Sequence, residues 1–396
     1  MLILRQLRKL NGQQRLQLGV EQTRRSMADA AQKNASFQYD KDPQPLFTDA
    51  ETQRLLQSMT QLQLEKVFRK RTVPDNSTET KFMTTAQLEK EFLQTIEKAK
   101  KLLQMPPVVQ IKQDTEHIIS KDPALKDFAD TKYVFTDITF GLRNSERKIV
   151  VRDADGTLAY APLETRKRMN QLYFPLEGRR SYTPRMFTHD DLLQRCLDEH
   201  KYEFVLDRLT VQYEPYEAEF HNFSAKVFAH LNESKEFDLL RSTRHFGPMA
   251  FFYAWHRCID DLLYDMIRRD YLHNAVELIS LSYKIHQVPV DYKPILSQLE
   301  ALKPTPAQRA LAELLSCLKK PAENAIEHEI QTAIGKTEQD FAADEISLKF
   351  IEQYIGSKHA LKKVQLELAV QTLKEVNLEK LQLYQGLKKA HGVQAS

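Results

Sequence analysis

Residues 131–184 read TKYVFTDITFGLRNSERKIVVRDADGTLAYAPLETRKRMNQLYFPLEGRRSYTP, and strand-forming residues cluster here more than anywhere else in the chain. The run from Lys132 to Phe140 is rich in β-branched and aromatic residues, which favour a strand. A second run, Lys148 to Val151, leads to the turn signal Asp153-Ala154-Asp155-Gly156, after which Thr157 to Ala161 can return as its partner. Glycine supplies the positive φ that a tight hairpin turn requires. The stretch therefore predicts a small β-hairpin element.

A basic helix and loop follow the predicted hairpin. The helix is expected over Leu163 to Phe174, because Pro175 cannot continue it. Between Gly141 and Arg185, ten basic residues stand against five acids, so the segment has five excess positive charges. Such a segment suits a phosphate backbone, since arginine can donate two N–H groups to one phosphate. An ordinary solvated face is the alternative.

A second basic run lies at Phe237 to Gly247, with the sequence FDLLRSTRHFG. Its two arginines are three residues apart and therefore neighbours on a helix, and they could grip phosphates or carboxylates or simply form local ion pairs. In the first segment, Arg179 and Arg180 follow Gly178 in a loop and are the preferred contacts. The predicted RNA-binding residues are Arg143, Arg147, Lys148, Arg166, Arg168, Arg179, Arg180, Arg185, Arg241 and Arg244.

The first 25 residues have the composition of a mitochondrial presequence. They contain six basic residues and one acid, with leucines at helical spacing. No apolar run is long enough for a secretory core or a membrane span. An ordinary surface helix is the alternative. Removing this +5 segment from a chain of net charge +3 leaves a mature protein of about −2, so the basic surface sits on a mildly acidic body.

The expected fold class is mainly α with a small β-hairpin element (α+β), because the 396 residues include only ten glycines. A presequence over 1–25 and a linker over 26–45 precede an N-terminal helical region, 46–130, whose last part from Val108 to Asp130 is less regular. The β-hairpin and basic helix/loop segment covers 131–187, and a C-terminal helical domain covers 188–396.

Local signals place several helix boundaries. Thr48 with Glu51, and Thr84 with Gln87, have capping-box spacing, and Thr188 is expected to cap a helix with an acidic first turn. The apolar run Met249 to Arg269 is expected to be one helix at the centre of the C-terminal core. The last helix, His359 to Ala390, carries a heptad-like stripe that favours an internal core face over a coiled coil.

Catalytic and cofactor sites are not indicated. The glycine spacing permits neither a phosphate-binding loop nor a dinucleotide fingerprint, and the twelve histidines are scattered. Asp260 and Asp261 are adjacent acids in the aromatic helix, and a structural role is the expectation for them. Three distant cysteines form neither a disulfide framework nor a zinc ligand set. We expect no enzyme activity, no cofactor, no metal and no small-molecule substrate.

Several long strings resemble one family. They are LEKVF, KFMTTAQLE, MPPVV, TKYVFTDI, KIVVR with GTL after it, RMNQLYFPLEGR with TP after it, and FDLLRSTRHFG. Together they resemble the animal mitochondrial ribosomal small-subunit protein family numbered twenty-two, from about Phe47 to about Ile285. The resemblance implies a non-catalytic structural protein of the mitochondrial small ribosomal subunit in the matrix, with rRNA and other mitochondrial ribosomal proteins as partners. The alternative is a helical-repeat adaptor, or an RNA-processing or assembly factor, of the mitochondrial matrix.

The presequence assignment is testable on the mature protein. Arg25 is a plausible processing determinant, so the matrix form should begin near Ser26. N-terminal sequencing of the protein isolated from mitochondria checks this expectation. Recovery of chains that begin at Met1 would contradict it.

Overall fold

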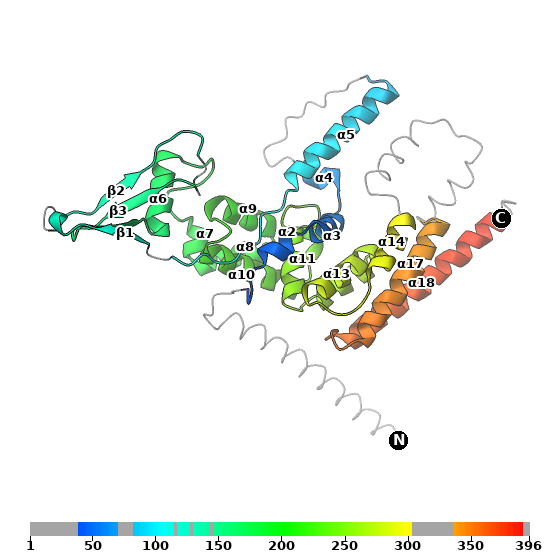
Figure 1. The fold of residues 1–396 in the computed structure, drawn as a ribbon. Helices are drawn as coiled ribbons and strands as arrows, with labels where there is room; N and C mark the ends of the chain where they lie inside the picture. Colours follow the sequence, from blue (N-terminus) through cyan, green and yellow to red (C-terminus); the bar gives the residue numbers. More distant parts are fainter. Residues whose placement is uncertain are drawn as a thin grey trace. The chain divides into compact units, whose positions relative to one another are not determined.

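The computed structural model describes residues 39–69, 82–114, 117–126, 130–142, 144, 146–302 and 336–390 (Figure 1). The chain divides into two compact units. The first contains the described residues up to Lys41 and from Val109 to Val227, and the second contains Asp42 to Val108 and the chain from Phe228 onward. The expected presequence lies outside the described residues. The expected linker is described only from Tyr39, and this residue is buried against the His221 ring, with the ring centroids 5.8 Å apart.

The first unit contains a four-stranded antiparallel sheet in the order β1-β4-β3-β2. The strands are β1 (Ile118–Lys121), β2 (Tyr133–Thr136), β3 (Ile149–Arg152) and β4 (Thr157–Tyr160). The predicted hairpin is β3 and β4, whose turn has Gly156 at φ 83°, and the first predicted strand is β2. Strand β1 was not predicted: together with the short 3₁₀ helix η1 (Pro123–Leu125), it comes from the stretch that was expected to be irregular.

One face of this sheet packs against a helix. The predicted basic helix is α6 (Leu163–Tyr173), and its Met169 lies on a buried cluster of Ile149, Val151 and Ala161 (Figure 1). Because side chains alternate along a strand, Val150 and Arg152 of β3 belong to the opposite face. The sheet is therefore covered by α6 on one side only, as far as the described residues show.

Short helices complete the first unit. They are α7 (Arg185–Thr188), α8 (Asp190–Asp198), α9 (Tyr202–Gln212) and the part of α10 (Ala218–Ser234) up to Val227. The cap expected at Thr188 is wrong, because this residue ends α7 and its hydroxyl donates to the carbonyl of Arg185. His189 precedes α8 and makes no side-chain capping bond.

The second unit is helical in its described part and combines two separate stretches of the sequence, Asp42 to Val108 and the chain from Phe228 onward. Its N-terminal elements are α2 (Gln44–Thr48), α3 (Ala50–Thr60), α4 (Leu64–Val67) and α5 (Thr85–Leu102). Its later elements are η2 (Phe237–Leu239), α11 (Phe246–Trp255), α12 (Asp260–Arg268), α13 (Leu272–Ile285), α14 (Lys293–Leu302), α17 (Glu338–Gly356) and α18 (Lys363–Ala390). Helix α13 packs against α3, α11, α12, α14 and α17, and its Leu278 and Ile279 are fully buried.

The apolar run expected as one central helix is two helices. Helix α11 ends at Trp255, Arg257 takes φ 57°, and α12 begins at Asp260. The aromatic core is confirmed at Phe251 and Tyr253, which are fully buried, whereas Trp255 is only half-buried.

The N-terminal helices dock onto this core. Phe47 of α2 meets the Phe251 ring edge-to-face, with centroids 5.2 Å apart. The cap expected at Thr48 is wrong, because Asp49 caps α3. The Asp49 carboxylate accepts the backbone N–H groups of Glu51 and Thr52. The predicted capping box of Thr84 and Gln87 is confirmed at the start of α5.

Helices α17 and α18 lie side by side and run antiparallel (Figure 1). Lys374 pairs with Glu352 at 2.6 Å, and Lys388 pairs with Glu338 at 2.7 Å. Leu366 and Leu373 of α18 are buried, so this face docks inside the protein. Across the described ranges, no helix is both long enough and apolar enough to cross a bilayer.

Replacing Phe251 with alanine should strongly destabilise the second unit. The fully buried ring would leave a cavity, and such changes cost about 3–5 kcal/mol. Urea unfolding of the purified chain measures the change. Phe82→Ala is the matched control, because this phenylalanine is fully exposed and its loss should change stability by at most about 0.5 kcal/mol. Equal midpoints for the two variants would contradict the assignment of Phe251 to the core.

Candidate nucleic-acid interface

Arg147 lies inside the first unit, although it was predicted at the surface. Its side chain is buried, with the residue 3% exposed. Nη1 donates to the carbonyls of Thr139 at 2.8 Å and Asp137 at 3.2 Å, and Nη2 donates to that of Leu142 at 3.0 Å. The guanidinium carbon also lies 3.3 Å from the Phe174 ring centroid. Arg147 therefore holds the connection between β2 and β3 onto the end of α6, and it is not placed to meet a phosphate.

The preferred loop pair divides into one inward and one outward side chain. The Arg179 side chain is 9% exposed, and its Nη2 pairs with Glu214 at 2.8 Å. Its Nε donates to the carbonyl of Val211 at 2.9 Å. The Arg180 side chain is exposed, but its backbone is held by the side-chain amide of Gln212. The Arg180 N–H donates to Oε1 of Gln212, and the Arg180 carbonyl accepts from Nε2 of Gln212. Only Arg180 of this pair offers its guanidinium to the surface.

The three consecutive basic residues of α6 point in different directions, as helix geometry requires. Arg166 is half-buried and donates to the carbonyl of Arg147 at 3.2 Å. Lys167 pairs with Glu217 at 2.6 Å and lies 4.7 Å from the centroid of the Tyr213 ring. Arg168 is exposed. Of these three residues, only Arg168 is therefore exposed.

The predicted residues of the first unit that are exposed are grouped under the name candidate basic surface. Its members are Lys148 before β3, Arg168 on α6, Arg180 in the loop after α6 and Arg185 at the start of α7. Arg143 lies outside the described residues. Exposed ammonium and guanidinium groups of this kind can donate to phosphate oxygens without a compensating loss of internal bonds.

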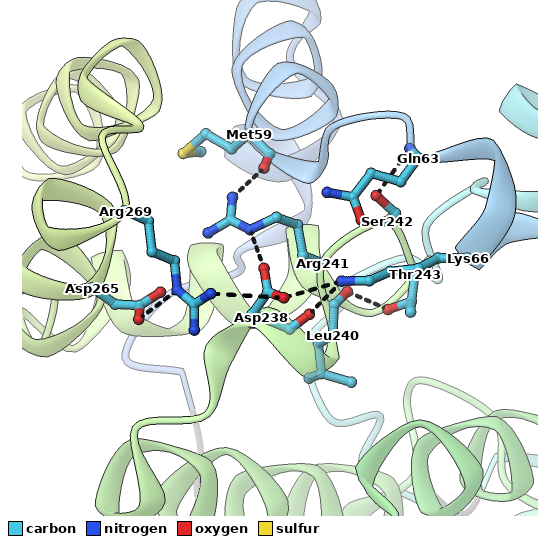
Figure 2. A network of polar contacts seen from close by, with 10 residues as sticks. All are labelled: Met59, Gln63, Lys66, Asp238, Leu240, Arg241, Ser242, Thr243, Asp265 and Arg269. Atoms are coloured by element: carbon cyan, nitrogen blue, oxygen red, sulfur yellow. Dashed lines mark hydrogen bonds and ion pairs between the residues drawn. The ribbon is translucent and has the colours of Figure 1, made fainter. Parts of the chain in front are cut away.

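Arg241 belongs to the second unit and is fully buried, which corrects its prediction as a surface contact. Figure 2 shows its Nε directed at Asp238, at 3.2 Å, and its Nη1 at the carbonyl of Met59, at 3.4 Å. The rings of Phe246 and Tyr271 flank the guanidinium, with centroids 4.9 and 4.6 Å away. Burial lowers the pKa of Arg241, and the neighbouring Tyr271 and Asp238 oppose this shift.

Ser242, Thr243 and His245 of the FDLLRSTRHFG run are buried as well, whereas Leu239 is exposed. The Ser242 backbone N–H donates to the carbonyl of Thr60. The Ser242 hydroxyl accepts the backbone N–H of Gln63, as Figure 2 shows. Arg244 is half-buried, and its Nε lies 3.4 Å from the Nε2 of His245. The run is therefore bonded to the end of α3 and to the start of α4, and it has a structural role.

The acids that could have been catalytic are structural as well. Asp260 accepts the Tyr354 hydroxyl at 2.9 Å and the backbone N–H groups of Leu361 and Lys362. Asp261 pairs with the Lys362 ammonium at 2.6 Å. These bonds hold the start of α18 against α12. In the described part of the chain, no three histidine, cysteine or acidic residues gather as metal ligands would.

One exposed feature was absent from the predicted site. Tyr133, Phe135 and Tyr160 project from the sheet on the face opposite α6, together with Arg152. Strand propensity could be read for these residues, but not the face on which they lie, because the side on which α6 packs is a tertiary property.

Exchanging Arg147 for alanine should destabilise the first unit even though the change looks like the loss of a surface charge. Three carbonyls would lose a charged donor, at a cost of about 2–3 kcal/mol. Chemical denaturation of the purified chain provides the measurement. Lys148→Ala is the neighbouring control, for which about 0.5 kcal/mol or less is expected. A stable Arg147→Ala protein would show that the connection does not need this residue.

Comparison with known proteins identifies the family of this chain. The family described as "Mitochondrial 28S ribosomal protein S22" matches residues 45–287. The small ribosomal subunit protein mS22 of Mus musculus is 37% identical over 267 residues, which cover 67% of this chain and 73% of the relative. The protein of the same name from Bos taurus is 39% identical over 242 residues, or 61% and 67% of the two chains. Since the family match covers more than half of the sequence, the chain belongs to the mitochondrial 28S ribosomal protein S22 family.

Proposed function

We propose that this chain is a non-catalytic structural component of the mitochondrial small ribosomal subunit that contacts rRNA through the candidate basic surface. It acts in the mitochondrial matrix, where its family belongs, and other mitochondrial ribosomal proteins contact the rest of its surface. The supporting observation is the division of the basic residues in the first unit. Arg147, Arg179 and Lys167 fix the fold, whereas Lys148, Arg168, Arg180 and Arg185 face outward.

The charge of the whole chain supports a mixed set of partners. Without residues 1–25 the net charge is about −2, given +3 for the full chain. A protein that coated RNA on every side would carry an excess of positive charge, because phosphate neutralisation supplies most non-specific affinity. A local basic surface on a mildly acidic body fits one RNA-facing side and several protein-facing sides.

The test is salt-washing of purified small subunits that carry Arg180→Ala and Arg185→Ala. Each lost phosphate contact should reduce the slope of log binding constant against log salt concentration by roughly one. The double variant should therefore leave the particle at a lower salt concentration than the wild type, and its binding should depend less steeply on salt. Lys349→Ala with Lys374→Ala is the control, because these exposed lysines lie on α17 and α18 of the second unit.

Two results would contradict the proposal. Retention of the double variant through the same salt range as the wild type would mean that the two arginines do not meet rRNA. Sedimentation of the wild-type protein away from the small subunit, with only transient association, would favour an assembly or RNA-processing factor of the matrix.

A further inference from the structure

The open face of the sheet in the first unit carries three exposed aromatic rings. Tyr133 and Phe135 of β2 are 42% and 50% exposed, and Tyr160 of β4 is 37% exposed. The register places them on one face, because Phe135 lies opposite Val150 and Val150 lies opposite Tyr160. Tyr133 lies opposite Arg152, two residues further along the same face. Helix α6 covers the other face through Ile149 and Val151.

The spacing of these rings is that of a stacking platform. Side chains two residues apart on a strand are separated by about 7 Å, and two strand spacings across the sheet span about 10 Å. This area accommodates two or three unstacked bases, which RNA-binding sheets hold against aromatic rings. Half of the Phe135 residue is exposed, so part of its ring is accessible to a base.

The polar groups on this face fit a nucleic acid better than an apolar protein surface. The Arg152 guanidinium carbon lies 5.4 Å from the Tyr133 ring centroid, an arrangement in which both groups can stack on a base. The His117 ring meets the Tyr160 ring edge-to-face, with the centroids 5.6 Å apart. Lys148, a member of the candidate basic surface, precedes β3 and by strand alternation belongs to this face.

The nearby carboxylates are already engaged. Asp153 pairs with Lys132 at 2.8 Å, and Asp155 lies 3.9 Å from Lys121. Asp137 accepts the backbone N–H and the hydroxyl of Thr139, and these bonds lower the pKa of Asp137. Among the described residues, the face therefore offers aromatic rings and the positive charge of Arg152 and Lys148 to an incoming RNA chain, with Val150 and Leu158 between them.

We infer that this sheet face binds unpaired bases of a single-stranded RNA segment by stacking on Tyr133, Phe135 and Tyr160. The inference rests on the proposed rRNA contact. It adds a second group of contacting side chains, which are uncharged aromatic rings rather than basic groups. Stacking on rings selects single-stranded over duplex RNA, whereas phosphate contacts do not.

The experiment measures binding of the full chain to a uridine oligonucleotide and to an RNA duplex across a range of salt concentrations. Tyr133→Leu with Phe135→Leu should weaken binding to the oligonucleotide by about tenfold for each ring lost, with an unchanged salt slope. Tyr182→Leu with Phe204→Leu is the matched control, since both rings are exposed in the same unit but outside the sheet. Phe135→Tyr keeps a stacking ring and should bind as the wild type does, which separates stacking from misfolding.

The outcomes separate this inference from the proposed function. If Arg180→Ala with Arg185→Ala weakens binding while the leucine variants do not, the basic surface stands and the sheet inference falls. Equal affinity for the oligonucleotide and the duplex would also overturn the inference. A full chain that binds neither RNA would overturn both proposals.

Crosslinking in the intact particle provides a second readout. Ultraviolet irradiation of purified small subunits should join rRNA uridines to residues 130–142 or 148–161, and the leucine variant should lose this product. Loss of a crosslink to a neighbouring protein instead, with the rRNA crosslink retained, would show that the face docks a protein and would overturn the inference.

Discussion

The second unit depends on the fully buried guanidinium of Arg241. A buried cation is costly unless other groups compensate its charge. Here Nε donates to Asp238 and Nη1 to the Met59 carbonyl, and two aromatic rings flank the guanidinium. These partners come from η2, the end of α3, α11 and the residue before α13, so one side chain fixes four segments. Met59 is nearly two hundred residues away in the chain. Its contact helps to explain why residues 42–108 group with the C-terminal helices rather than standing alone.

The first unit uses arginine in the same way. Arg147 and Arg179 donate to backbone carbonyls and so fix segments that have few ladder bonds of their own. Both backbone polar groups of Arg180 are hydrogen-bonded to the Gln212 side chain, so the exposed arginine side chain extends from a fixed backbone. A contact made from a fixed backbone loses less conformational entropy on binding than one made from a free loop. The inward arginines thus help to position the outward ones.

The predictable parts of the fold depend on residues close together in sequence. The Asp-Ala-Asp-Gly turn, the Thr84 and Gln87 capping box and the stop at Pro175 involve two to five neighbouring residues each, and all were predicted. The capping of α3 by Asp49 was missed because Thr48 has the same capping chemistry one position earlier. The break near Arg257 was missed because an apolar run does not show where the chain turns. Strand β1 needs β4 as a partner, and its sequence alone has no strong strand pattern.

Local patterns and long shared strings were enough to predict the helical class, the hairpin, the basic helix and the family likeness. The segment with the excess positive charge could also be identified from its residues. Which of those charges face solvent depends on how the chain packs. Arg147 and Arg180 have the same side chain in the same segment, yet one is surrounded by carbonyls and the other faces solvent. The physical reason is that burial is set by the packing of distant segments, and a charged side chain is compatible with either environment when donors and acceptors match.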